Sequence, residues 1–211
     1  GGIFCYYGGR VDKSIISSNF ASLAGGVFCY EGGLIENCLI TENSANNVGG
    51  IYIQYIGIVN NCTISDNTGN NYGGGISCWG ATSTLTVQNS TVSGNTSPNG
   101  GGIYINDSAL TLQDTTISGN SATTSGGGIL IEGSGVGNID NVTISGNTAG
   151  VGGGIRNNGS LIISNTAISG NSSTSSGGGV YNSGLGMILT NVTISGNTAN
   201  AGGGISNVTP S

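Results

Sequence analysis

The chain has 211 residues, of which three are basic and nine acidic, so its net charge is −6 and histidine is absent. Three basic side chains cannot neutralise a nucleic-acid backbone or hold the chain on an anionic membrane, and no apolar run of about 18 residues predicts a membrane-spanning helix. Five cysteines without zinc-ligand spacing complete a composition from which we expect no metal and no cofactor.

Glycine supplies 43 residues, but the absence of a Gly-X-Y period excludes collagen. Glycine-rich chains with few aromatic residues are often disordered. Here Ile, Val and Leu recur at regular intervals, and a disordered linker has no reason to keep them so. The composition therefore predicts an ordered fold with a thin, repeated core.

A glycine run followed by a β-branched residue recurs every 24 to 27 residues. The β-branched residues are Ile3, Val27, Ile51, Ile76, Ile103, Ile129, Ile155, Val180 and Ile205. A repeat of this length is typical of a solenoid, in which each unit buries its apolar face against its neighbours. We call the units coils 1 to 8, each beginning at one of these residues, with a partial ninth from Ile205. Residues 1–211 are expected to form a single domain without separate caps.

Three short alternating stretches lie in each coil, as coils 5 and 6 illustrate. The first follows the glycines (103–105), the second precedes an Asx residue (110–112), and the third has the form Val142-Thr143-Ile144. Their period of two predicts strands, and turn residues separate them. Three strands per coil without a helix predict an all-β parallel β-helix. An antiparallel sandwich would instead require two-residue hairpin loops and variable core positions, which do not occur.

Asn occupies one position in all eight coils, three residues after an aliphatic residue of the third strand: Asn19, Asn43, Asn67, Asn95, Asn120, Asn147, Asn171 and Asn197. Asn tolerates the left-handed conformation, and its amide can bond to the same amide in the next coil. We therefore interpret this column as a structural ladder; ligand binding is the alternative interpretation. A second Asx column precedes the third strand, and Lys13 interrupts it in coil 1.

The pairing of Gly-Gly-Gly-Ile with Ile-Ser-Gly-Asn, well developed between Gly126 and Ile155, resembles the repeat pair of polymorphic outer-membrane proteins. It is also similar to a wider set of bacterial right-handed β-helix surface proteins and adhesins. The resemblance extends over the whole chain, although Ile or Val stands where that family often has Phe. It implies a right-handed β-helix, secretion or surface display, and adhesion or scaffolding.

Polysaccharide-degrading β-helix enzymes need clustered acids with a base or cation nearby. Here only Glu42 and Asp66 are expected to stack, and Arg10 and Lys13 lie a coil or more away. We interpret the two acids as solvated turn residues, and we expect no catalytic residue and no enzymatic activity. A pair of carboxylates alone is a poor Ca²⁺ site.

The cysteines also fall into columns. Cys5, Cys29 and Cys78 share an inward position of the first strand, while Cys38 and Cys62 share one where other coils carry Ser, Thr or Val. Cysteine thus replaces small core residues, which predicts buried free thiols. A disulfide between Cys5 and Cys29, or between Cys38 and Cys62, is the alternative.

Two sets of outward residues form the expected interaction surface. Threonine hydroxyls line the third strand at Thr63, Thr91, Thr116, Thr143 and Thr193, which is similar to the Thr-x-Thr array of β-helical ice-binding proteins. Aromatic residues gather in the first four coils, and Tyr6, Tyr30 and Trp79 share an outward position. These rings are suited to contact glycans or another subunit, but an ordinary exposed strand face would explain both sets as well.

The sequence therefore predicts an extracellular or cell-surface structural protein with an adhesive role. Its partners are expected to be identical chains stacked end to end into a filament, neighbouring repeats of a longer adhesin, or glycans, with no nucleic acid and no membrane insertion. A polysaccharide-binding or polysaccharide-degrading protein is the first alternative, and an ice-binding protein is the second.

Overall fold

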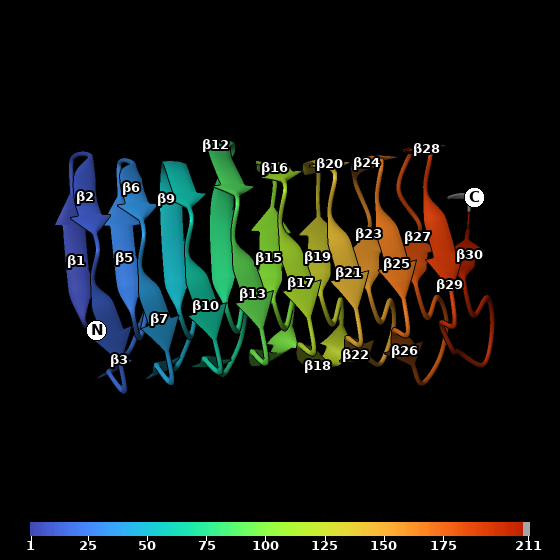
Figure 1. The fold of residues 1–211 in the computed structure, drawn as a ribbon, viewed down its shortest axis with the longest axis horizontal. Helices are drawn as coiled ribbons and strands as arrows, with labels where there is room; N and C mark the ends of the chain where they lie inside the picture. The colour runs from blue at the N-terminus through green and yellow to red at the C-terminus, as the bar shows by residue number, and fades with distance from the viewer. Residues whose placement is uncertain (209–211) are drawn as a thin grey trace.

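Alternation of apolar and polar residues places one side of every strand inside a stack of coils. The computed structural model describes residues 1–208, which form an all-β solenoid with the coils stacked along one axis (Figure 1). All strand pairs between successive coils are parallel, and the expected columns are in register, as in Ile40↔Ile64 and Ile64↔Val92. The predicted parallel β-helix with three strands per coil is confirmed. Residues 209–211, which the single-domain prediction included, lie outside the described part.

Sheet 1 contains 15 strands and holds the first and second strand of each coil. The first strands are β1 (Ile3–Tyr6), β5 (Val27–Tyr30), β15 (Ile103–Asn106), β19 (Ile129–Glu132), β23 (Ile155–Asn157), β27 (Val180–Asn182) and β30 (Ile205–Asn207). The second strands are β2 (Gly9–Asp12), β6 (Gly33–Glu36), β16 (Ala109–Gln113), β20 (Val136–Asp140), β24 (Ser160–Ser164) and β28 (Gly186–Thr190). In coils 3 and 4 the two join in β9 (Ile51–Asn60) and β12 (Ile76–Gln88).

Sheet 2 contains eight strands and holds the third strand of each coil. These strands are β3 (Ile15–Ser17), β7 (Leu39–Thr41), β10 (Thr63–Ser65), β13 (Thr91–Ser93), β17 (Thr116–Ser118), β21 (Thr143–Ser145), β25 (Ala167–Ser169) and β29 (Thr193–Ser195). The central residue of each strand points inward. Ile40, Ile64 and Ile117 are fully buried there, which is why an aliphatic residue recurs at this position.

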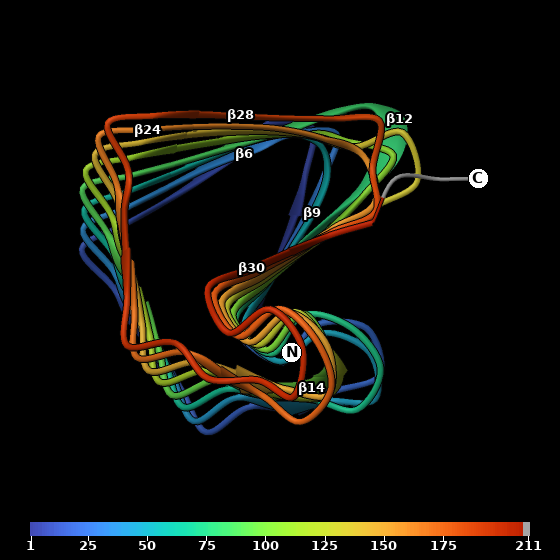
Figure 2. The ribbon, with the colours of Figure 1, turned by 90° about the vertical axis from the view of Figure 1, so that its right-hand side faces the viewer.

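Sheet 3 contains seven short strands, each of which directly follows a ladder Asn. These strands are β4 (Phe20–Ala21), β8 (Ser44–Ala45), β11 (Thr68–Gly69), β14 (Thr96–Asn99), β18 (Ser121–Ser125), β22 (Thr148–Ala149) and β26 (Ser172–Ser173). Their inward residues are small, and the sequence alone suggests only turns at these positions. Viewed along the axis, the successive coils lie nearly on top of one another (Figure 2).

The Asn ladder holds the turn between sheets 2 and 3. Seven side-chain hydrogen bonds of 2.9–3.0 Å join its eight members, and in each the Nδ2 donates to the Oδ1 of the next coil. The same Nδ2 also donates to a carbonyl of the preceding coil, as Asn95 does to Ile64 O at 2.9 Å. Each interior Asn therefore connects three coils. This position is fully buried from Asn43 to Asn171, so the amides satisfy groups that water cannot reach.

The glycine run lets neighbouring coils approach closely at the corner before the first strand. A Cβ at Gly50 would lie 2.4 Å from the carbonyl oxygen of Gly75 in the next coil. Gly100 has a φ of +63°, a conformation that L side chains adopt at a cost. The close approach of the coils and the positive φ together explain why two or three glycines precede the first strand of each coil.

Candidate functional site: the surface of coils 1 to 3

Acidic side chains do not form a cluster that could hold a metal ion in the described residues. No group of three or more His, Cys, Asp or Glu side chains comes together in residues 1–208. Glu42 and Asp66 lie at successive corners between sheets 2 and 3, where Glu42 accepts a hydrogen bond of 3.2 Å from Ser18 Oγ. Arg10 forms ion pairs with Glu36 at 2.6 Å and with Asp12 at 3.3 Å. It forms no ion pair with Glu42 or Asp66 within the described residues.

Four tyrosines lie where the first strand meets the second in coils 1 to 3, and we call them the tyrosine surface: Tyr6, Tyr7, Tyr30 and Tyr55. The rings of Tyr6 and Tyr30 stack at 5.0 Å with an interplanar angle of 4°. Tyr7 packs edge-on against Tyr6 at 4.3 Å, and Tyr55 packs edge-on against Tyr30 at 5.9 Å. Tyr6, Tyr7 and Tyr55 are 53%, 70% and 41% exposed. The cluster is therefore ordered by its own contacts and still accessible.

Two hydroxyls of the tyrosine surface, those of Tyr6 and Tyr30, have a raised pKa. A hydrogen bond with Tyr7 raises the pKa of Tyr6 above its ordinary value. The nearby Tyr55 hydroxyl is the main cause of the raised pKa of Tyr30, with burial and Glu31 adding to it. The stacked pair Tyr6 and Tyr30 is consequently neutral and amphipathic at neutral pH, with Glu31 as an acidic neighbour.

Trp79 lies on the expected outward side, but packing covers much of it. Its ring contacts Tyr52 at 6.1 Å, Tyr72 at 4.9 Å and Tyr104 at 5.8 Å. Tyr52 belongs to a small second core with Ala24 and Val48 outside the solenoid interior. The Nε1 of Trp79 is buried and has no hydrogen-bond partner within residues 1–208. Trp79 thus anchors this second core, whereas Tyr6 and Tyr30 stand at its exposed margin.

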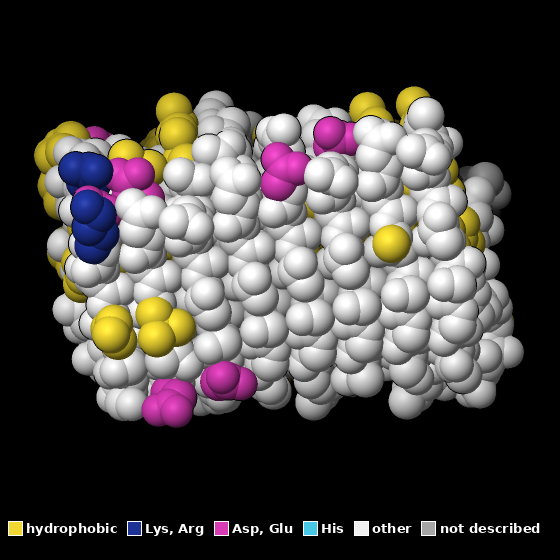
Figure 3. All heavy atoms as spheres, viewed as in Figure 1, with side chains coloured by type: hydrophobic (Ala, Val, Ile, Leu, Met, Phe, Trp, Pro, Cys, Tyr) yellow, Lys and Arg dark blue, Asp and Glu magenta, His cyan; other side chains and the backbone are white. Residues whose placement is uncertain are grey.

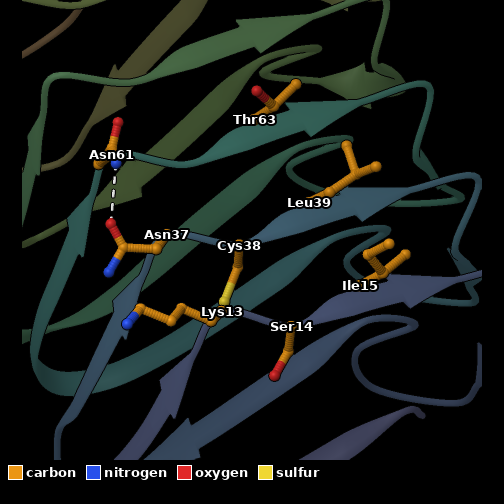
Figure 4. Close-up of a pocket in the computed structure, with 8 residues that line it drawn as sticks. All are labelled: Lys13, Ser14, Ile15, Asn37, Cys38, Leu39, Asn61 and Thr63. Atoms are coloured by element: carbon orange, nitrogen blue, oxygen red, sulfur yellow. Dashed lines mark hydrogen bonds between the residues drawn. The ribbon is translucent and has the colours of Figure 1, made fainter.

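A pocket of about 440 Å³ lies at the corner between the second and third strands of coils 1 to 3 (Figure 4). Lys13, Asn37 and Asn61 border one side, and the outward side chains of Ile15, Leu39 and Thr63 border the other. Ser14 and Cys38 lie between the two sides (Figure 4). Asn61 Nδ2 donates to Asn37 Oδ1 at 2.8 Å, and Asn37 Nδ2 donates to Asp12 Oδ1 at 2.8 Å.

The threonine row occupies the outer face of sheet 2. Thr63, Thr91, Thr116, Thr143 and Thr193 are in register from coil to coil, with Ala167 as the expected interruption. None of these five hydroxyls has a hydrogen-bond partner in the part of the chain that the structure describes. Figure 3 shows this face as flat and nearly uncharged, with basic side chains gathered at its N-terminal (left) end.

All five cysteines, which lie within the described residues, are free thiols. Cys38 and Cys62 behave like hydroxyl residues, because each donates to the carbonyl two residues earlier, at 3.0 and 3.2 Å. Ser90 and Thr115 do the same in the next coils, at 2.6 and 2.8 Å. Burial raises the pKa of Cys29 to about 12 and of Cys78 to about 11. These protonated thiols are structural and poorly suited to nucleophilic chemistry.

Some structural residues escape sequence reasoning. A further column of Asn residues lies on the first strands of the last coils. Hydrogen bonds of 2.7 Å connect Asn157 to Asn182 and Asn182 to Asn207. This column occupies the inward position that Cys or Ile fills in coils 1 to 6, and the 25-residue spacing of these Asn residues is the signal that could have revealed it. Tyr7 and Tyr55 have no such signal, because they occupy a positive-φ position that holds different residue types from coil to coil, such as Glu31 in coil 2.

Comparison with known proteins gives one result. A family model described as a right-handed beta helix region matches residues 1–122 and, in a second match, residues 74–208. No curated protein and no solved structure matches the chain. The structure contains no helix long and apolar enough to cross a membrane in residues 1–208.

Proposed function

The chain belongs to the right-handed β-helix family, and on that premise we propose that it is an extracellular or cell-surface structural protein that adheres through the tyrosine surface, without catalysis. The tyrosine surface is the observation that carries the proposal. It places exposed, mutually packed aromatic rings on a solenoid whose buried amides bond one another from coil to coil. The resemblance to polymorphic outer-membrane proteins and adhesins supports surface display.

Glycans are the partner that suits the tyrosine surface best. Neutral tyrosines combine an apolar ring face with a hydroxyl that can donate or accept a hydrogen bond. A sugar ring presents the same combination of C–H faces and hydroxyls. Large exposed aromatic patches commonly mark interaction sites, and Glu31 is a charged neighbour of Tyr6 and Tyr30.

Binding to a panel of neutral and acidic polysaccharides tests this function. We expect Tyr6→Ala combined with Tyr30→Ala to lower the affinity for a bound glycan about tenfold, because the stacked pair is lost. Tyr181→Ala in coil 8 is the matched control and should leave affinity unchanged. If no glycan binds, or if the double variant binds like the parent chain, the tyrosine surface is not the adhesive site. Incubation with acidic polysaccharides should release no shorter products.

The adhesive β-helix is proposed to act either within a longer surface adhesin or in a filament of identical chains stacked end to end. The in-register, parallel pairing of successive coils supports this proposal, because it uses main-chain groups that every coil possesses. Negative-stain microscopy of the purified chain should show long fibres if copies stack. Monodisperse, folded monomers at high concentration would rule out the filament.

Ice binding is a second candidate, favoured by the unpartnered hydroxyls of the threonine row on a flat, in-register sheet. Freezing hysteresis at high protein concentration tests it. Thr116→Tyr combined with Thr143→Tyr should abolish the hysteresis, because two bulky rings interrupt the flat face. The absence of hysteresis in the parent chain removes this candidate.

A further inference from the structure

The pocket beside Lys13 is separate from the tyrosine surface, because the two lie at different corners of the coil. The tyrosines lie where the first strand meets the second, while the pocket lies at the turn that follows the second strand. A volume of about 440 Å³ is within the usual range for small-molecule sites. Its lining combines apolar side chains with a few polar groups, which is the composition such sites generally have.

One positive charge is available in this pocket. Arg10 is occupied by Glu36 and Asp12, at 2.6 and 3.3 Å. Lys13 forms no ion pair within residues 1–208 and is exposed. It also adopts a φ of +48°, at a position where the other coils carry Asn or Asp. Lys13 therefore interrupts the second Asx column. It also adopts a backbone conformation that Asn and Asp tolerate better than lysine does.

Two apolar side chains form the opposite side of the pocket. Ile15 is 74% exposed and pairs in register with Leu39 on the neighbouring strand. Leu39 is half-buried. Later coils carry Thr or Ala at this position, so an outward aliphatic pair is peculiar to coils 1 and 2. Covering these side chains with an apolar ligand would remove hydrophobic surface from water, which is favourable.

Polar groups complete the lining at the edge nearest coil 4. Asn89 donates to Asn60 and not to Asn61, which leaves the Oδ1 of Asn61 without a donor in the described residues. The hydroxyl of Thr63 is also unpartnered there. A ligand that fits this lining has one negative charge for the single lysine, an apolar body, and modest hydrogen-bonding capacity.

We propose that this pocket binds a small monocarboxylate that carries an apolar ring. The carboxylate pairs with Lys13 Nζ, and the ring lies across Ile15 and Leu39 (Figure 4). One lysine and the neutral amides of Asn37 and Asn61 match one negative charge and not the two of a phosphate monoester. The site is shallow and solvent-exposed, so we expect weak binding, with a dissociation constant on the order of 1 mM.

Titration with benzoate and cyclohexanecarboxylate, followed by amide chemical shifts, tests the site. Benzamide is the uncharged control for benzoate. We expect shifts confined to residues around Lys13, Ile15 and Leu39, and about fivefold weaker binding of benzamide, because the charge pair is missing. Raising the ionic strength should weaken benzoate binding and leave benzamide unchanged.

The chain itself supplies matched variants, because other coils show which residues fold at these positions. Lys13→Asn introduces the residue of the neighbouring coils, and it should weaken benzoate binding about fivefold without loss of folding. Lys13→Arg should retain binding. Leu39→Thr should weaken benzoate and benzamide alike, since it removes the apolar side of the pocket.

Two results would overturn the proposal. The first is that benzamide binds as tightly as benzoate, and the second is that Lys13→Asn leaves the affinity for benzoate unchanged. Either outcome shows that no carboxylate site exists. Glycan binding by the same variants should be unchanged, so failure of this site is distinguishable from failure of the tyrosine surface.

Discussion

Coils 1 to 3 and coils 4 to 8 have one architecture but use different residues where the backbone turns. Within residues 1–208, each positive-φ position of coils 4 to 8 is held by Gly, Asn or Asp. Coils 1 to 3 also place other side chains there: Tyr7, Lys13, Ser18, Glu31, Glu42 and Tyr55. Bulky residues rarely adopt this conformation, and strained positions tend to cluster at functional sites. The strain coincides with the tyrosine surface and the Lys13 pocket.

The corner between sheets 2 and 3 shows the difference directly. Gly94, Gly119 and Gly146 occupy it in coils 4 to 6, with φ of +66°, +63° and +64°. Glu42 and Asp66 occupy it in coils 2 and 3, with φ of +58° and +55°. The later coils therefore follow the backbone preference, whereas the first three display side chains at some conformational cost. The shared interior makes this cost tolerable.

The largest expected effect concerns what the two regions share. Asn67→Ala in coil 3 and Asn120→Ala in coil 5 should each lower the free energy of unfolding by roughly 3–5 kcal/mol, since each removal leaves several buried groups unpaired. Urea denaturation measures both. Asn141→Ala, in the exposed Asx column, should cost only about 1 kcal/mol. A much smaller effect at Asn67 than at Asn120 would show that the ladder does not serve both regions equally.

Alkaline pH should affect coils 2 to 5 first. Burial raises the pKa of Cys29, Cys62, Cys78, Tyr52 and Tyr104. Since the folded state favours the protonated groups, their contribution is complete below the unfolded pKa values and is lost as pH rises from about 9 toward 12. Cys29 alone accounts for on the order of 2 kcal/mol by pH 11.

Trp79, the single tryptophan, reports on coil 4 in this titration. Its fluorescence should change at a lower pH than the far-ultraviolet circular dichroism of the whole chain. Coincident transitions would mean that the coils unfold together and that the two regions do not differ in alkali resistance. On the acid side, hydrogen bonds from Ser164 and Asn165 lower the pKa of the half-buried Asp140. Any loss of this contribution therefore begins below the ordinary Asp pKa and ends below its folded value.

The smallest expected effect separates the two cysteine columns. Cys38→Ser should change stability by less than about 0.5 kcal/mol, because Ser makes the same hydrogen bond in coil 4. Cys29→Ser should cost roughly 1–3 kcal/mol, because its column is apolar in coils 1 to 6 and offers the hydroxyl poor partners. Urea denaturation of both variants, under reducing conditions, tests the contrast. Equal losses would contradict the hydroxyl-like role of Cys38.

Repetition explains how much of the fold could be predicted. Columns such as Ile40, Ile64 and Val92 are visible as spacing in the sequence and become in-register neighbours in sheet 2. Sheet 3 could not be predicted in the same way, because its inward positions are small residues with no periodic pattern along a two-residue strand. Its pairing follows from stacking of the coils and not from local preference.

The candidate site depends on departures from the repeat, which sequence columns reveal only in part. Tyr6 and Tyr30 share a column and were predicted to face outward. Tyr7 and Tyr55 join them through turn geometry that only the structure supplies. Lys13 was visible as an interruption, but the pocket also requires the outward pair Ile15 and Leu39 in the same lining.

The direction of the Asn ladder has a consequence for how the solenoid is built. In every rung, an Asn donates to the side-chain oxygen of the Asn in the following coil. Asn95, for example, donates through its backbone N–H and its Nδ2 to Oδ1 of Asn120. A chain that emerges N-terminus first, from a ribosome or a secretion channel, thus always carries a folded end whose donors await the next coil. The amide–amide bonds of the ladder are thus completed one coil at a time, in the order in which the polypeptide is delivered.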